Sequence, residues 1–273
     1  MKNFKDKRIL ITGGASGIGK IMAQLFLERK AKVILWDINQ EQLNQTVTEF
    51  QILGTIHGML VDVSDPKQIE SSAANVKASY GNVDVLINNA GIIVGSYFHE
   101  HSPDAIERTM SINSLGPMYT TKAFIGDMMV RNAGHICTIA SSGGLLGNPK
   151  MAVYAGSKWS VIGWSDSLRI EMQQLKKEIQ VTTIMPYYIN TGMFDGVQSK
   201  IPILNPEIAA LTIVNAIAKN KKMVTIPGYI YRVTRLAQAV LPLSVFDWFT
   251  GSVLGIYKTM EGFTGRKNGS QTL

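Results

Sequence analysis

Short runs of apolar, often β-branched residues alternate with longer helix-like stretches along most of this chain. The runs are nearly continuous rather than mixed with polar residues, which is typical of parallel strands covered by helices on both faces. Right-handed crossovers between such strands give a doubly wound sheet. The sequence therefore predicts an α/β fold with about seven strands, at 8–12, 32–36, 56–61, 84–88, 135–140, 180–185 and 222–226.

The 273 residues contain no internal repeat, low-complexity tract or linker-like stretch. We expect one domain over 1–273, with a substrate lid and C-terminal helical region at 185–273 inside it. Residues 1–8 are charged and predict neither a signal peptide nor a membrane anchor. The single cysteine, Cys137, lies in an expected strand and is interpreted as an inert core thiol of a cytoplasmic protein.

The formal net charge is +7, and residues 221–273 carry seven basic side chains, Arg266 and Lys267 among them, against two acidic ones. No nucleic-acid-binding module accompanies this charge, so we expect no nucleic-acid partner. His99 and His101 lack carboxylate or cysteine partners at ligand spacing. We therefore expect no metal site.

A glycine-rich turn at 12–19 joins the first expected strand to the first expected helix. Glycines allow a tight turn in which backbone N–H groups approach a pyrophosphate, and the helix N-terminus attracts the same negative charge. The position between a strand and a helix is typical of Rossmann-type dinucleotide binding. The residues expected to contact the cofactor are Gly13, Ser16, Gly17, Ile18 and Gly19.

Asp37 lies 18 residues after Gly19, at the end of the second expected strand. A carboxylate there accepts hydrogen bonds from the adenosine ribose hydroxyls and repels the 2′-phosphate of NADP. The next residue is Ile38 rather than arginine, and Ser16 adds no positive charge. These residues favour NAD over NADP, while a helix N-cap role for Asp37 remains the alternative.

Two further strand ends are candidate cofactor contacts. Asp62 and Val63 follow the third strand, where a polar side chain can hydrogen-bond the adenine edge; a helix cap is the alternative interpretation. Asn89, Ala90 and Gly91 follow the fourth strand and suit close packing against the nicotinamide ribose. An asparagine there can also simply satisfy loop backbone groups.

Tyr154 and Lys158 are four residues apart, on one face of an expected helix. Free tyrosine titrates near pH ~10, but a cation about 4 Å away interacts with the phenolate by up to ~4 kcal/mol at an effective dielectric of ~20. Ser141 precedes Tyr154 by 13 residues and can hold the substrate oxygen, with Ser142 as its neighbouring competitor. Asn113 lies in a long helix-like stretch, where its amide holds either a relay water or a structural hydrogen bond.

With these motifs in order, the chain resembles the short-chain dehydrogenase/reductase family from end to end. The resemblance implies that Tyr154 is the acid/base and that Ser141 orients the substrate. It implies that Lys158 binds ribose and lowers the Tyr154 pKa, and that Asn113 completes a proton relay. It also implies a homodimer or homotetramer. The segments 186–194, 202–207 and 260–266 resemble the retinol dehydrogenase and 17β-hydroxysteroid dehydrogenase branch, although residues 1–8 do not predict that branch's N-terminal anchor. By analogy, Pro186, Ile189 and Thr191 lie beside the nicotinamide.

Between Arg235 and Lys258 lie 22 residues with a single charge, Asp247. Prolines and glycines argue against a membrane span, and helical spacing indicates two amphipathic segments. A pocket cap or subunit contact is favoured over peripheral membrane contact through 229–260. Together with Met193 and Phe194, these segments predict an apolar substrate. One expected apolar face comprises Ile230, Val233, Leu236, Ala237 and Val240, and the other comprises Val245, Phe246, Trp248, Phe249 and Leu254.

The sequence thus predicts an NAD-dependent oxidoreductase that interconverts a lipophilic secondary or allylic alcohol and its carbonyl. Retinoid-like, steroid-like and long-chain substrates all remain open. A reductase of a soluble ketone or 3-oxoacyl thioester is disfavoured, because Asp37 disfavours NADP. An NAD-bound scaffold or sensor that docks through its C-terminal apolar and basic patch is also disfavoured, because binding alone does not need Ser141, Tyr154 and Lys158 together.

Overall fold

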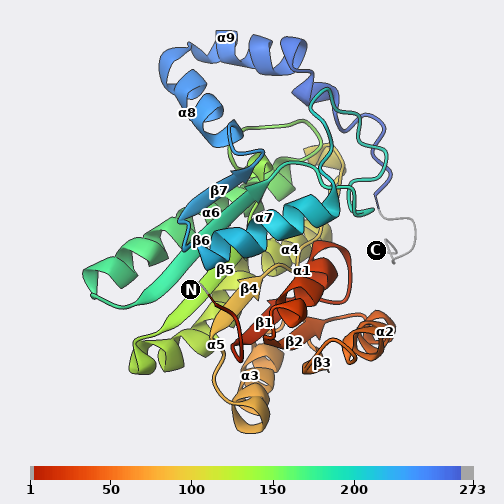
Figure 1. The fold of residues 1–273 in the computed structure, drawn as a ribbon. Helices are drawn as coiled ribbons and strands as arrows, with labels where there is room; N and C mark the ends of the chain where they lie inside the picture. Colours follow the sequence, from red (N-terminus) through yellow and green to blue (C-terminus); the bar gives the residue numbers. More distant parts are fainter. Residues whose placement is uncertain (1–2, 266–273) are drawn as a thin grey trace.

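The computed structural model describes residues 3–265. Its strands form one parallel sheet in the order β3-β2-β1-β4-β5-β6-β7, which confirms the doubly wound fold (Figure 1). Arg266 and Lys267, counted in the basic C-terminal segment, lie outside the described residues. The strands are β1 Arg8–Thr12, β2 Lys32–Asp37, β3 Ile56–Leu60, β4 Val85–Asn88, β5 Gly134–Ile139, β6 Ile179–Pro186 and β7 Met223–Ile226.

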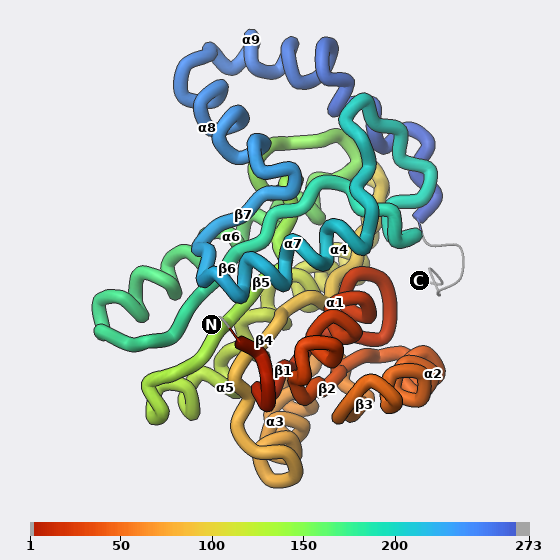
Figure 2. Tube along the Cα trace, viewed as in Figure 1, coloured from red at the N-terminus to blue at the C-terminus, as the bar shows by residue number. Residues whose placement is uncertain are grey.

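Helices cover both faces of the sheet, as Figures 1 and 2 show. Phe26 of α1 and Ile213 of α7 belong to the apolar core on one face, and Phe124 of α5 and Leu168 of α6 to the core on the other. Burying each such side chain contributes ~1.5–3 kcal/mol. The helices are α1 Gly17–Glu28, α2 Gln40–Phe50, α3 Pro66–Tyr80, α4 Pro103–Met110, α5 Gly116–Arg131, α6 Ala152–Gln174 and α7 Pro206–Ala218.

The strand order reverses beside β1, because the chain crosses from β3 at one edge to β4 on the other side of β1. Loops that follow β1 and β4 therefore diverge and leave a crevice at the carboxyl ends of the strands. At the edge, β3 departs from the expected continuous burial. Its Leu60 side chain is largely exposed, and its His57 ring stacks on Tyr80 with centroids 4.2 Å apart.

After β7, the chain forms α8 (Ile230–Val240), α9 (Leu243–Trp248) and a π-helical turn (Phe249–Val253). These elements, residues 230–253, are called the lid below. The lid stands away from the sheet at the end of the molecule opposite α3 (Figure 1). None of the helices within residues 3–265 is both long and apolar enough to cross a membrane.

The lid corrects one detail of the sequence interpretation. Ile230 and Ala237 face the protein, whereas Val233, Leu236 and Val240 are largely exposed on α8. The five apolar residues do lie on one side of α8, because helical residues follow one another at about 100° and these positions span roughly a third of the circumference. Only the edge of this side that carries Ile230 and Ala237 is turned to the protein, and the rest of it is exposed.

Candidate active site

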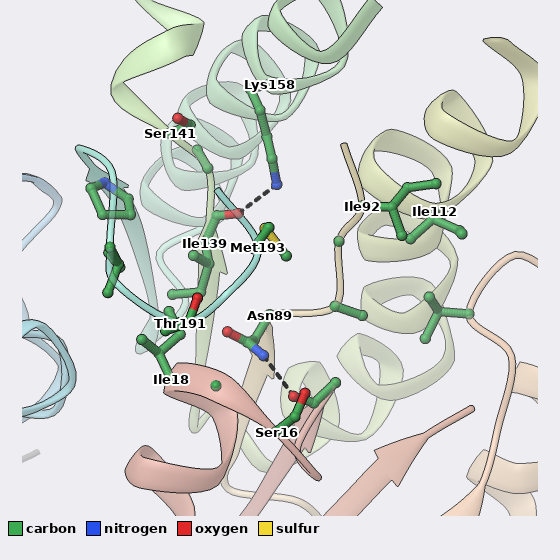
Figure 3. A pocket seen from close by; sticks show the side chains of 18 of the residues that line it. Ser16, Ile18, Asn89, Ile92, Ile112, Ile139, Ser141, Lys158, Thr191 and Met193 are labelled. Carbon is green, nitrogen blue, oxygen red and sulfur yellow. Dashed lines mark hydrogen bonds between the residues drawn. The ribbon is translucent and has the colours of Figure 1, made fainter. Parts of the chain in front are cut away.

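A strand-edge pocket lies at the carboxyl ends of the sheet strands, with a cavity of about 270 Å³ (Figure 3). All the site residues expected from the sequence line this pocket, except Gly19 and Asn113. The expected residues that line it are Gly13, Ser16, Gly17, Ile18, Asp37, Asp62, Val63, Asn89, Ala90, Gly91, Ser141, Tyr154, Lys158, Pro186, Ile189 and Thr191.

The glycine-rich turn is held tightly against the loop after β4. Gly13 has φ +62°, a left-handed conformation that favours glycine, and a Cβ there would approach Ala90. Asn89 donates from Nδ2 to the Thr12 carbonyl at 3.0 Å and to the Gly13 carbonyl at 2.9 Å. A Cβ at Gly19 would overlap the Gly13 carbonyl oxygen, so Gly19 permits close packing of the turn and does not line the pocket.

Asp37 ends β2 and presents its carboxylate at the pocket. Its Oδ2 accepts from the Ala15 N–H at 2.9 Å, and its Oδ1 accepts from the Asn39 N–H at 3.0 Å. The N-cap of α2 is Asn39, whose side chain accepts from the Gln42 N–H. The helix-cap interpretation of Asp37 is therefore wrong, and each carboxylate oxygen keeps lone pairs for a further donor.

Asp62 is likewise not a helix cap. The N-cap of α3 is Asp65, which accepts from the Lys67 N–H at 2.9 Å. Asp62 accepts instead from the Ser64 N–H at 2.8 Å and the Ser64 hydroxyl at 2.7 Å, and it lines the pocket beside Val63. Its side chain therefore shapes the loop after β3 at the pocket wall.

Tyr154, Ser141 and Lys158 meet where β5 ends and α6 begins. The Tyr154 hydroxyl is hydrogen-bonded to the Ser141 side chain, and Ser141 Oγ accepts from the Gly143 N–H at 3.0 Å. Lys158 Nζ lies 5.7 Å from the Tyr154 ring centroid and donates to the Ile139 carbonyl at 3.1 Å (Figure 3). Ser141 lines the strand-edge pocket and Ser142 does not, which distinguishes the two adjacent serines.

Burial sets the protonation of this group. Desolvation raises the pKa of Tyr154 to about 12, partly opposed by the hydrogen bond with Ser141. Desolvation also lowers the pKa of Lys158 to about 8. In this structure, burial of the phenol outweighs any lowering of the Tyr154 pKa by Lys158.

The low pKa of Lys158 predicts a pH-dependent stability. Between pH 8 and the ordinary value of 10.5, the unfolded chain holds more protons at this site than the folded chain, so the stability contribution of Lys158 rises with pH. Lys158→Met removes this dependence. We expect the free energy of unfolding of the wild type, measured in urea at pH 8, 9 and 10, to rise relative to that of the variant by about 2 kcal/mol over this range. The pH dependence that comes from Tyr154 is present in both proteins and cancels in the comparison. Parallel plots of unfolding free energy against pH for the two proteins would contradict the prediction.

Asn113 lies outside the pocket, in a π-helical turn (Ser111–Leu115) that interrupts the helix between α4 and α5. Its Oδ1 accepts from the Ile92 N–H at 2.8 Å, and its Nδ2 donates to the Ile92 carbonyl at 2.9 Å and to Ser157 Oγ at 3.1 Å. The structural hydrogen bond is therefore present: Asn113 ties the loop after β4 to α6. Its role in a proton relay stays a prediction.

A second pocket, the lid pocket, lies beneath the lid with a cavity of about 110 Å³. Ser141, Tyr187 and Phe194 line both pockets, so the two cavities are neighbours with Ser141 in their shared wall. Gln238 of α8 donates to the Leu145 carbonyl at 2.8 Å and fixes the lid to the body. Apolar lid residues lining the pocket are Ile230, Val233, Ala237, Phe246 and Phe249, and Leu254, directly after the lid, also lines it.

Several pocket residues were not identified from the sequence. Arg108 and Ile112 line the strand-edge pocket, one helical turn apart. Their spacing of four residues indicates that they share one side of a helix, but the sequence does not show that this side faces the pocket. Tyr187 directly follows β6 and lines both pockets, and its position after a strand was a comparable signal. Among residues 3–265, no cluster of His, Cys, Asp and Glu is arranged to hold a metal ion.

Known proteins share both the sequence and the fold of this chain. A family model described as short chain dehydrogenase matches residues 7–202. Epidermal retinol dehydrogenase 2 of Mus musculus is 34% identical over 97% of this chain and 88% of its own length. Estradiol 17-beta-dehydrogenase 11 of Homo sapiens is 35% identical over 88% of this chain and 81% of its own length.

Among solved structures, a short chain dehydrogenase/reductase from Burkholderia phymatum in complex with NAD superposes with a TM-score of 0.81. The superposition covers 88% of this chain and 95% of that one at 25% identity. The resemblance to the retinol and 17β-hydroxysteroid dehydrogenase branch is confirmed by the relatives. The chain therefore belongs to the short-chain dehydrogenase/reductase family and is an oxidoreductase acting on CH–OH groups.

Proposed function

We propose that this protein is an NAD-dependent dehydrogenase that interconverts a lipophilic secondary or allylic alcohol and its carbonyl, with Tyr154 as the acid/base. The observation that carries the proposal is the position of Ser141. Its side chain is hydrogen-bonded to Tyr154, and the residue lines both the strand-edge pocket and the lid pocket. An alcohol held there has its oxygen at the phenol and its apolar part beneath the lid.

The strand-edge pocket fits a dinucleotide. The Gly13 turn and the start of α1 present backbone N–H groups suited to a pyrophosphate, and Asp37 has free lone pairs suited to ribose hydroxyls. The hydroxyl oxygens of a ribose beside Lys158 would accept hydrogen bonds from its ammonium. A bound NAD would supply the hydride acceptor for the alcohol carbon. The Burkholderia phymatum relative, solved with NAD, supports this choice of cofactor.

The chain's own groups handle the proton. Ser141 donates to or accepts from the substrate oxygen, while the Tyr154 hydroxyl exchanges the proton with that same oxygen. Oxidation requires Tyr154 to act as phenolate, which burial opposes. We infer that Lys158 supplies the opposing charge: an ammonium 5.7 Å from the ring favours the phenolate by about 3 kcal/mol at an effective dielectric of ~20.

An apolar substrate is supported by the walls of the lid pocket. Phe194 packs edge-on against the Tyr154 ring, with centroids 6.0 Å apart, and the lid supplies Phe246 and Phe249. Removing apolar surface from water contributes ~25 cal/mol per Å², so such walls favour hydrocarbon over polar substrates. The relatives named retinol and estradiol dehydrogenases agree with this substrate class.

The proposal is tested by initial-rate NADH production with a panel of alcohols. The panel pairs apolar substrates, such as retinol, estradiol and long-chain secondary alcohols, with small polar ones, and NADP is run in parallel. We expect turnover of apolar alcohols with NAD preferred. Activity confined to NADP(H) and small polar carbonyls would refute both the cofactor and the substrate class.

A further inference from the structure

We propose that the outer face of the lid docks on the surface of an anionic lipid bilayer, so that the lid pocket receives its substrate from the membrane. The inference deepens the proposed function, since it assigns the source of the apolar substrate. The face comprises nine exposed apolar side chains: Tyr229, Val233, Leu236, Val240, Leu243, Val245, Trp248, Phe249 and Val253.

The exposed apolar residues of α8 form a stripe along the helix. On α8, Val233, Leu236 and Val240 are spaced by three and four residues, which places them on one side of the helix. Leu236 is 67% exposed and Trp248, from α9, is 61% exposed. Ile230 of α8 is buried in the core beneath the lid, and Phe246 of α9 is buried where it lines the lid pocket. A stripe of this kind is typical of a helix that lies in a bilayer interface.

The lid pocket shares residues with this face. Tyr229, Val233 and Phe249 line the lid pocket and are also exposed to solvent. A molecule entering between them passes from the apolar stripe directly to the pocket that ends at Ser141. A bilayer against the face leaves this route open to lipid-dissolved alcohols, whereas a protein partner seated there would cover it.

The charge around the face favours anionic lipid. Arg232 and Arg235 flank the stripe on α8, and Lys258 follows the lid; within residues 3–265, no carboxylate lies within ion-pair distance of any of the three. Asp247, the lid's only carboxylate, accepts a hydrogen bond from the Tyr257 hydroxyl at 2.7 Å. A second copy of the chain would bring the same cations together, while phosphatidylserine complements them.

The test is flotation of the full chain, with NAD, on vesicles of phosphatidylcholine alone or with phosphatidylserine. We expect binding to the mixed vesicles and a loss of about tenfold in the double variant Leu236→Ser/Trp248→Ser, neither residue of which lines a pocket. Arg232→Gln/Arg235→Gln should lose the preference for phosphatidylserine. The control Ile52→Ser/Val130→Ser, at sites 85% and 89% exposed outside the lid, should bind as the wild type does.

Equal flotation of the wild type and the Leu236→Ser/Trp248→Ser variant, or none by either, would overturn the docking. So would a wild-type dimer without vesicle binding that this variant converts to monomer, since the face would then be a self-association surface. Turnover of a water-soluble alcohol should be unchanged in the variant. A variant that loses vesicle binding but keeps turnover bears on the docking alone. A wild type that binds vesicles but turns over no alcohol would refute the proposed function and leave the docking intact.

Discussion

Tyr154→Phe is expected to lower kcat by about 10²–10⁴-fold on any alcohol that the wild type oxidises. The substitution removes only the hydroxyl that is hydrogen-bonded to Ser141, and the buried ring position remains filled. The proton of the substrate hydroxyl then has no acceptor beside Ser141. NAD affinity, measured by titration of the protein fluorescence, should change by less than about twofold, because the phenol hydroxyl is one contact among many along the cofactor.

Tyr257→Phe is the matched control for the loss of a phenol. Its hydroxyl donates to Asp247 at 2.7 Å, and the residue lines neither pocket. We expect its kcat to remain close to that of the wild type. A Tyr154→Phe enzyme that keeps its kcat would refute the proposed acid/base role, and one that loses NAD affinity in parallel would show that the phenol acts mainly in cofactor binding.

The central sheet could be predicted because its strands are buried on both faces. Val33, Leu35 and Ile87 have no exposed surface, so each strand needed an uninterrupted apolar run that is visible in the sequence. The site followed from the same sheet, since Asp37, Asn89 and Ser141 all lie at carboxyl ends of strands. Parallel topology brings such ends to one edge whatever their distance along the chain.

Features that depend on three-dimensional packing could not be predicted. The π-helical turn around Asn113 differs from an α-helix by one hydrogen-bond step, which leaves no periodic signal in the sequence. The raised pKa of Tyr154 depends on complete burial of the phenol, which spacing along the chain does not reveal. On α8, the helical periodicity predicts an apolar side. It does not reveal that Ile230 on that side is buried while Leu236 is exposed.

Asp37→Asn is expected to lower the preference for NAD over NADP by about 100-fold, measured as the ratio of the two kcat/KM values. Charge-assisted hydrogen bonds contribute about 1.5–3 kcal/mol, so loss of the charge weakens NAD by about 10–100-fold. NADP gains at the same time, because the 2′-phosphate no longer meets a carboxylate. Adding Ile38→Arg should move the preference further toward NADP, since residue 38 also lines the pocket.

The design separates this charge effect from damage to the turn. Asparagine keeps one oxygen acceptor, so one of the two N–H groups now bonded to Asp37, on Ala15 and Asn39, loses its partner. We expect a cost of about 1–3 kcal/mol in the free energy of unfolding, which urea denaturation measures independently of activity. Asp62→Asn removes a second pocket carboxylate after β3, and it should weaken both cofactors alike. A ratio that Asp37→Asn leaves unchanged would mean that the Asp37 carboxylate does not meet the adenosine ribose, and that NAD preference arises elsewhere in the pocket.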